Sequence, residues 1–130
     1  MAHSIIFSTD APAPIGPYSQ AVQAGDTVYV SGQIPLDALG QMVGNGDVAA
    51  ETHQVMRNLQ AVLGAAGLTL ANIVKCSIFV KDLQNFGRIN DIYGSYFDAG
   101  YAPARETVEV SRLPKDVQVE ISCIAVRQSA

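Results

Sequence analysis

Apolar and polar residues alternate without interruption along residues 117–123, which read Val-Gln-Val-Glu-Ile-Ser-Cys. A β-strand points successive side chains to opposite faces of its sheet, so this period of two predicts a strand with one buried row and one polar row. Glu120 lies in the middle of the polar row. The chain is therefore expected to fold into layers, with a sheet that is covered on one face and open on the other.

The remaining segments predict further strands and two helices. The first helix is indicated by apolar residues at helical spacing between Asp47 and Gly67. Asp47 is a good N-cap residue, and a glycine such as Gly67 commonly follows the last residue of a helix. The second helix is expected over residues 85–100 and the other strands over residues 4–7, 18–25, 27–34, 72–81 and 105–110. The order β-β-β-α-β-α-β-β predicts a single α+β domain over residues 1–130, with both helices on one face of the sheet.

Alternation within the strands also suggests which side chains share a face. We expect the more apolar row of each strand to meet the helices; these rows contain Val74, Cys76, Ile78 and Val80, then Glu106, Val108 and Val110. The opposite rows are mixed in character, and they contain Ser31, Lys75, Ser77, Arg105, Thr107 and Glu120. Arg105 and Glu120 are thus expected on one open face, on adjoining strands that are joined by a turn at residues 112–116.

An arginine and a glutamate on one sheet face allow two interpretations. They could form a surface ion pair, which contributes less than about 1 kcal/mol to stability. They could instead form a site for a small organic acid, because a guanidinium grips a carboxylate through two parallel hydrogen bonds. A partly buried glutamate can take a proton from a water molecule, so the second interpretation suits a hydrolytic reaction.

The amino-acid composition favours contact with another protein subunit over binding to nucleic acid or a membrane. Charged residues make up 15% of the chain and apolar residues 48%, whereas about 25% charged residues is usual for a globular domain. We therefore expect part of the surface to contact another subunit. The formal net charge is -4 and no basic stripe is present, so binding to nucleic acid is not expected. No apolar run approaches the roughly 20 residues that a membrane span needs, so no membrane partner is expected.

Cysteines and histidines indicate neither a disulfide framework nor a metal site. Cys76 and Cys123 are the two cysteines, and both lie among apolar strand residues. Buried free thiols are typical of a cytoplasmic protein. The two histidines, His3 and His53, lie far apart in the sequence without a neighbouring cluster of ligands, so no metal is expected.

Several short motifs occur in a fixed order along the chain. They are "IGPYSQAV", "VYVSGQIP", "VKDLQNF", "PAR" and "EVSRLPKDVQVEI". Together they make the chain resemble the RidA/YjgF family of reactive-intermediate deaminases over essentially its whole length. The resemblance implies a chorismate-mutase-like α+β fold and a homotrimer in which three sheets line a barrel, with a site in each cleft between subunits. It also implies hydrolysis of 2-imino acids, such as 2-iminobutanoate and 2-iminopropanoate, to 2-keto acids and ammonia, without metal or cofactor.

The same motifs assign roles to individual residues by resemblance. Arg105 of "PAR" would hold the substrate carboxylate, and Glu120 of "VQVEI" would position or activate the attacking water. The resemblance implies that the substrate pocket also includes Tyr18, Ser31, Gly32 and Asn90. Ser31 would supply a hydroxyl group and Gly32 a backbone N–H.

The chain departs from the family pattern directly after Arg105. The family usually has a small residue and then, in its best-known deaminases, a cysteine, where this chain has Glu106 and Thr107. The Thr107 hydroxyl could still bond a water or ligand. The missing cysteine leaves open a regulatory module that binds a 2-keto acid without catalysis. An endoribonuclease, an activity of some relatives, is a third possibility that the acidic balance of the chain disfavours.

Overall fold

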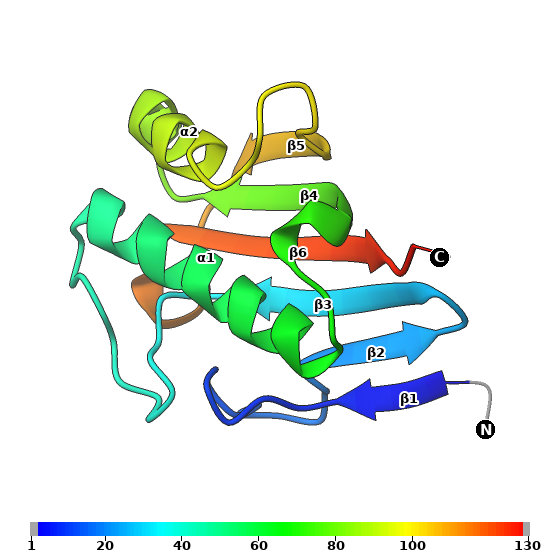
Figure 1. The fold of residues 1–130 in the computed structure, drawn as a ribbon. Helices are drawn as coiled ribbons and strands as arrows, with labels where there is room; N and C mark the ends of the chain where they lie inside the picture. The colour runs from blue at the N-terminus through cyan, green and yellow to red at the C-terminus, as the bar shows by residue number, and fades with distance from the viewer. Residues whose placement is uncertain (1–2, 129–130) are drawn as a thin grey trace.

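The structure, a computed structural model, describes residues 3–128. Within these residues the chain forms one six-stranded sheet and two α-helices, and both helices lie on the same side of the sheet (Figure 1). The order along the sheet is β1-β2-β3-β6-β4-β5. The strands are β1 (His3–Ile6), β2 (Ala21–Ala24), β3 (Thr27–Gln33), β4 (Ile73–Val80), β5 (Ala104–Glu109) and β6 (Val119–Val126). The predicted α+β class is confirmed.

The first helix, α1 (Val48–Ala65), begins where the sequence predicts. Asp47 is its N-cap, and the side chain accepts hydrogen bonds from the backbone N–H groups of Ala49 and Ala50 at 3.0 and 3.3 Å. These bonds satisfy two of the donors that a helix leaves free at its start. The apolar stripe of α1 is buried against the sheet, chiefly through Val55, Met56, Leu59, Val62 and Leu63.

The second helix, α2 (Phe86–Gly94), is shorter than the expected 85–100. A short 3₁₀ helix, Leu83–Asn85, precedes it. It buries Ile89 and Tyr93, and it covers the side of the sheet near β4 and β5 (Figure 1). Neither helix of the described residues is long and apolar enough to cross a membrane.

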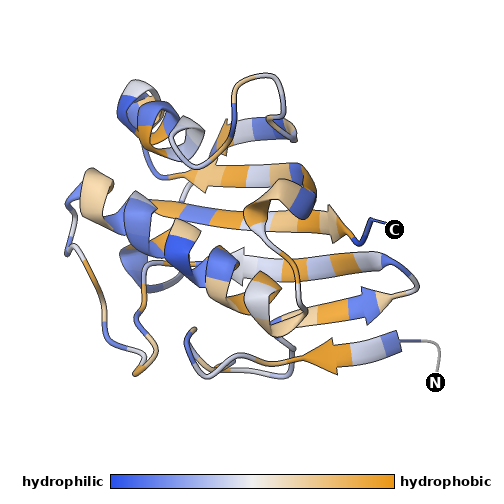
Figure 2. Ribbon diagram, in the orientation of Figure 1, coloured by the Kyte–Doolittle hydropathy of each residue, from blue (hydrophilic) through white to orange (hydrophobic). Residues whose placement is uncertain are grey.

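The alternation along β6 is confirmed as a buried row and a more open row. Val119 and Ile121 are fully buried, Cys123 is nearly so, and Glu120 and Ser122 between them are half-buried. Figure 2 shows the corresponding change between apolar and polar residues along β3 and β6. Cys76 and Cys123 are buried free thiols, as predicted, and they lie opposite each other on β4 and β6.

The expectation that Val74 belongs to the buried row of β4 is wrong. The register between β4 and β6 shifts between Ile73 and Lys75. This irregularity turns Val74 outward, where it is 47% exposed, and buries Ile73 instead. The row that meets the helices is therefore Ile73, Cys76, Ile78 and Val80.

The expectation that Arg105 and Glu120 share a face on adjoining strands is also wrong. β4 lies between β5 and β6, because the connection from β4 through α2 brings the chain back as a parallel strand at the sheet edge. Arg105 is paired with the buried Cys76, so it lies on the helix side of the sheet. Glu120 is paired with Phe79, on the side without helices, which we call the open face. The mixed row of β5 thus faces the helices, contrary to the prediction.

Candidate functional site

The first group of predicted site residues lines a cavity on the open face. Its volume is about 410 Å³, and its walls come from the loop before β2, from β3, from β6 and from the short 3₁₀ helix Pro114–Asp116. The cavity is lined by Ile15, Tyr18, Ser31, Gly32, Ile34, Pro114 and Glu120. The structure thus brings together four residues that the sequence motifs single out: Tyr18, Ser31, Gly32 and Glu120.

Gly32 is required by the close approach of Glu120. The register between β3 and β6 shifts between Val30 and Gln33, and Gly32 lies in this irregular stretch. A Cβ atom at position 32 would overlap Oε2 of Glu120. Glycines in such irregular strand positions commonly mark a place where another group approaches the backbone. Here that group is the carboxylate of Glu120.

Glu120 is half-buried in this cavity. Burial raises the pKa of its carboxyl group above the usual value, because water stabilises the charged form less well there. No ion pair involves Glu120 among residues 3–128. A carboxyl group whose pKa moves toward neutrality is better matched to proton transfer with a bound water.

A buried glutamate on α1 fixes the backbone that leads into β6. Glu51 is 1% exposed, and its carboxylate accepts hydrogen bonds from the N–H groups of Gly46 and Gln118, both at 2.8 Å. Gln118 lies two residues before Glu120. Glu51 was not predicted from the sequence, although its position one turn before Val55 on the buried stripe of α1 is a signal that could have identified it.

Ser31 joins the loop before β2 to β3. Its hydroxyl donates a hydrogen bond to the carbonyl oxygen of Ser19 at 2.6 Å, and its N–H donates to the carbonyl oxygen of Gln20 at 2.9 Å. The donor of the hydroxyl group is therefore committed to the backbone. Its oxygen can still accept a hydrogen bond from a ligand in the cavity.

The second group of predicted site residues lies on the helix side, around Arg105. The Nη1 group of Arg105 donates a hydrogen bond to Oδ1 of Asn90 at 2.6 Å. The guanidinium carbon lies 5.5 Å from the ring centre of Phe86 and 5.2 Å from that of Tyr93. Three side chains of α2 thus hold the guanidinium by one hydrogen bond and two cation–π contacts.

Phe86 and Tyr93 were not identified as neighbours of Arg105 from the sequence. Their spacing with Asn90 places all three on one face of α2, and this spacing is the signal that could have found them. Among residues 3–128, Arg105 forms no ion pair with a carboxylate. Its guanidinium is exposed, so it remains available to an anionic ligand.

Thr107 follows Arg105 on the same side of β5, where it pairs with the buried Ile78. Its hydroxyl oxygen is buried and has no hydrogen-bond partner within the described residues. Burial, together with the adjacent Cys76 thiol, raises the pKa of Tyr93, and burial raises the pKa of Cys76. Both groups are therefore neutral near pH 7, and Arg105 supplies the charge of this cluster.

Glu106 points away from Arg105, as expected. On the open face its carboxylate forms an ion pair with Nζ of Lys75 at 3.2 Å and accepts a hydrogen bond from the hydroxyl group of Ser77. The hydrogen bond from Ser77 and the charge of Lys75 lower the pKa of Glu106. Glu106 is thus engaged with β4, and it is separated from the Arg105 guanidinium by the sheet.

Residues 8–127 match the sequence model of the family described as Endoribonuclease L-PSP. The chain belongs to this family, which is the RidA/YjgF family. The relatives include a 2-iminobutanoate/2-iminopropanoate deaminase of Salmonella typhimurium, with 48% identity over 95% of this chain and 97% of the relative. A protein of the same name from Mus musculus is 47% identical over 95% of this chain and 90% of the relative.

Solved structures of the family have the same fold as this RidA/YjgF chain. The YjgF gene product of E. coli superposes with a TM-score of 0.89 at 45% identity, over 96% of this chain and 99% of the other. E. coli TdcF with bound serine superposes with a TM-score of 0.89 at 42% identity, over 96% and 99%. The family resemblance drawn from the sequence motifs is thereby confirmed.

Proposed function

We propose that this RidA/YjgF protein is a hydrolytic deaminase of reactive 2-imino acids, such as 2-iminobutanoate and 2-iminopropanoate. The products are 2-keto acids and ammonia. The observation that carries the proposal is the half-buried carboxylate of Glu120, which lies over the backbone of Gly32 inside a cavity of about 410 Å³. Two relatives with 48% and 47% identity carry the name of this activity.

The proposed site is formed between two copies of the chain in a homotrimer. Arg105 and Glu120 lie on opposite faces of the sheet, so one copy cannot direct both side chains at one small ligand. A second copy can contribute the missing half, and a closed ring repeats that contact without leaving an open end. Exposed apolar side chains on the open face, such as Tyr29 and Val108, favour its burial against another subunit.

In the proposed reaction the guanidinium of Arg105 grips the substrate carboxylate, with Asn90 fixing the orientation of the guanidinium. Glu120 accepts a proton from a water molecule as the water oxygen bonds to C2 of the protonated imine. Glu120 then passes this proton to the nitrogen. As the C2–N bond breaks, the hydroxyl group on C2 gives its own proton to the ionised Glu120, so that ammonia leaves and the 2-keto acid forms. A protonated imine is itself electrophilic, so this reaction needs no cofactor.

The threonine at position 107 is compatible with this mechanism. Water is the nucleophile, so the reaction does not require a thiol at that position. The buried hydroxyl oxygen of Thr107 lies on the same side of β5 as Arg105 and offers a hydrogen-bonding group to the ligand. We therefore expect threonine in place of cysteine at position 107 to change substrate preference or rate rather than to abolish hydrolysis.

The test couples the protein to a threonine or serine dehydratase that releases fresh imine, and it follows 2-keto acid formation. Wild type should accelerate the final step, whereas Arg105→Ala should not, and both should have the same oligomeric state by size exclusion. Arg105→Lys is the matched control, because it keeps the charge but loses the planar fork. Undiminished turnover by Arg105→Ala would refute the role given to this residue.

A regulatory module that binds a 2-keto acid is the second candidate function. It is favoured by Thr107, which stands where the best-known deaminases have a cysteine. A relative, E. coli TdcF, has a solved structure with bound serine. This candidate predicts that 2-ketobutyrate raises the melting temperature while the coupled assay shows no acceleration. Acceleration by wild type decides for the deaminase.

An endoribonuclease is named in the description of the family. The formal net charge of -4 does not favour binding to a phosphate backbone. RNA cleavage by purified protein that disappears in Glu120→Gln would decide for this activity.

A further inference from the structure

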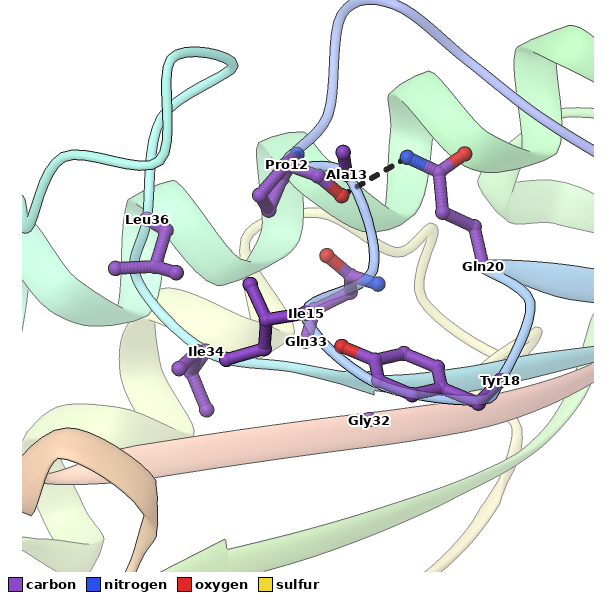
Figure 3. A pocket seen from close by; sticks show the side chains of 9 residues that line it. All are labelled: Pro12, Ala13, Ile15, Tyr18, Gln20, Gly32, Gln33, Ile34 and Leu36. Atoms are coloured by element: carbon purple, nitrogen blue, oxygen red, sulfur yellow. Dashed lines mark hydrogen bonds between the residues drawn. The ribbon is translucent and has the colours of Figure 1, made fainter.

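A second, smaller cavity lies behind the wall of the proposed site. It has a volume of about 30 Å³ and lies between the loop before β2 and the end of β3 (Figure 3). Ile15, Tyr18, Gly32 and Ile34 line both this cavity and the larger one that contains Glu120. A space of this size accommodates one or two water molecules if polar groups are present to bind them.

Gln33 places an unpartnered polar atom at this cavity. Gln33 is 4% exposed, and its Oε1 atom has no hydrogen-bond partner within the described residues. Its Nε2 group points back to the carbonyl oxygen of Ser31 at 3.5 Å. Reversal of the amide would set two acceptor oxygens against each other, so the oxygen end is the one left without a partner. In Figure 3 the amide projects from β3 toward the loop.

Gln20, the other buried glutamine of this cavity, cannot supply that partner. Its Oε1 accepts a hydrogen bond from the N–H of Ser8 at 2.6 Å, and its Nε2 donates to the carbonyl oxygens of Ser8 and Pro12 at 3.1 and 3.0 Å. Both amide hydrogens are therefore used. Figure 3 shows the bond from Gln20 to Pro12 along the far wall of the cavity.

The hydroxyl group of Tyr18 is the remaining side-chain group that can join a hydrogen-bond chain here. Tyr18 lines the same cavity as Gln33, and its hydroxyl end points toward the space below the Gln33 amide in Figure 3. A hydroxyl group can donate to a water molecule, and the water can donate in turn to a carbonyl oxygen. One water molecule held by the Tyr18 hydroxyl group would thus supply the missing partner of Gln33 Oε1.

We propose that the smaller cavity binds a water molecule that accepts a hydrogen bond from Tyr18 and donates one to Oε1 of Gln33. Gln33 is then a positioning residue, because it fixes the ring of Tyr18 through this water. The ring in turn forms a wall of the larger cavity. The water site stands on the structure alone, whereas its effect on turnover rests on the proposed deaminase function.

The water site is tested without any assay of activity. A high-resolution crystal structure of the wild-type protein should show a water molecule within hydrogen-bonding distance of Gln33 Oε1 and Tyr18 Oη. Gln33→Met keeps the length of the side chain and removes the acceptor, so it should lower the melting temperature. If Oε1 has no water partner, the same change removes an unpaired buried polar group and should leave the melting temperature equal or higher. That result, or an occupant other than water at Oε1, would overturn the proposal.

The positioning role is tested by a double-mutant cycle. Gln33→Met should reduce kcat/KM in the coupled assay by roughly threefold to tenfold, as expected for one lost hydrogen bond. In a Tyr18→Phe background the same change should have almost no further effect, because the hydroxyl group through which it acts is gone. Equal losses in both backgrounds would overturn the role. If wild type itself shows no turnover, the deaminase proposal fails and the water site is still judged by the crystal structure.

Discussion

Gly32→Ala should disable the proposed site while leaving the fold intact. The added Cβ would overlap Oε2 of Glu120, and it would lie 2.9 Å from Cδ and 3.1 Å from Cγ. Carbon atoms in favourable contact are about 3.5–4.0 Å apart, so the carboxylate must move away from the backbone. The flexible side chain of Glu120 can make this movement, and the backbone at position 32 does not require glycine for its φ angle.

The displacement sets the expected size of the effect. A misplacement of about 1 Å in a catalytic group can reduce the rate about 100-fold. We therefore expect kcat in the dehydratase-coupled assay to fall about 100-fold, with a loss of stability within about 1 kcal/mol. Glu120→Gln should produce a comparable loss, and the double variant should be no worse than Glu120→Gln alone, because both changes act on one group.

Gly64→Ala is the matched control for this prediction. Gly64 lies on the exposed side of α1, and a Cβ there meets nothing within 4 Å. The same chemical change should stabilise the helix by about 1 kcal/mol and leave turnover unchanged. Full activity of Gly32→Ala, with Glu120 found displaced in a crystal structure, would refute the reasoning about the carboxylate position.

Three further predictions concern pH and stability. Burial raises the pKa of Glu120 above its value in the unfolded chain, so the stability that its neutral form contributes is lost as pH rises through the raised pKa; thermal melts should show Glu120→Gln gaining stability relative to wild type as pH rises from acidic values through that range. A constant difference would contradict this. Asp47→Ala should lower the free energy of unfolding by about 1 kcal/mol in urea titrations, through loss of the α1 cap; no change would argue against the capping bonds. Leu59→Ala should cost about 2–5 kcal/mol by the same measurement, because Leu59 is fully buried; a loss below about 1 kcal/mol would contradict that packing.

Segments in which apolar residues recur with a regular spacing could be predicted from the sequence. The alternation around Glu120 predicted the buried and open rows of β6, and the apolar stripe after Asp47 predicted α1. In both segments one face is buried along its whole length, so the pattern of residue types follows the pattern of burial.

The face on which Arg105 lies could not be predicted in the same way. Alternation shows which residues of a strand share a row, but it does not show which row meets the helices unless the two rows differ in burial. β5 is an edge strand, and only Thr107 among its six residues is not exposed. Val108 and Glu106 therefore lie on the open face despite the more apolar character of their row. The decisive information is the register of β5 with β4, which depends on the path of the chain through α2.

The residues around Glu120 could be identified from the sequence more completely than those around Arg105. Three separate motifs contribute Tyr18, the pair Ser31 and Gly32, and Glu120, and the structure brings them to one cavity. Asn90 and Arg105 are also brought together, but the aromatic contacts of Arg105 depend on how α2 is rotated over the sheet edge. That rotation is set by the burial of Ile89 and Tyr93 and is a property of tertiary packing.

The small buried surface of α2 has a consequence for motion. This nine-residue helix buries only Ile89 and Tyr93, whereas α1 buries nine of its 18 residues. Elements with few buried contacts open locally at lower free energy than the rest of a protein. The amide hydrogens of α2 should therefore exchange with solvent faster than those of α1. Each such opening would release Arg105 from Asn90 and the two aromatic rings, so the guanidinium would lose and regain its fixed orientation while the sheet and α1 stay folded.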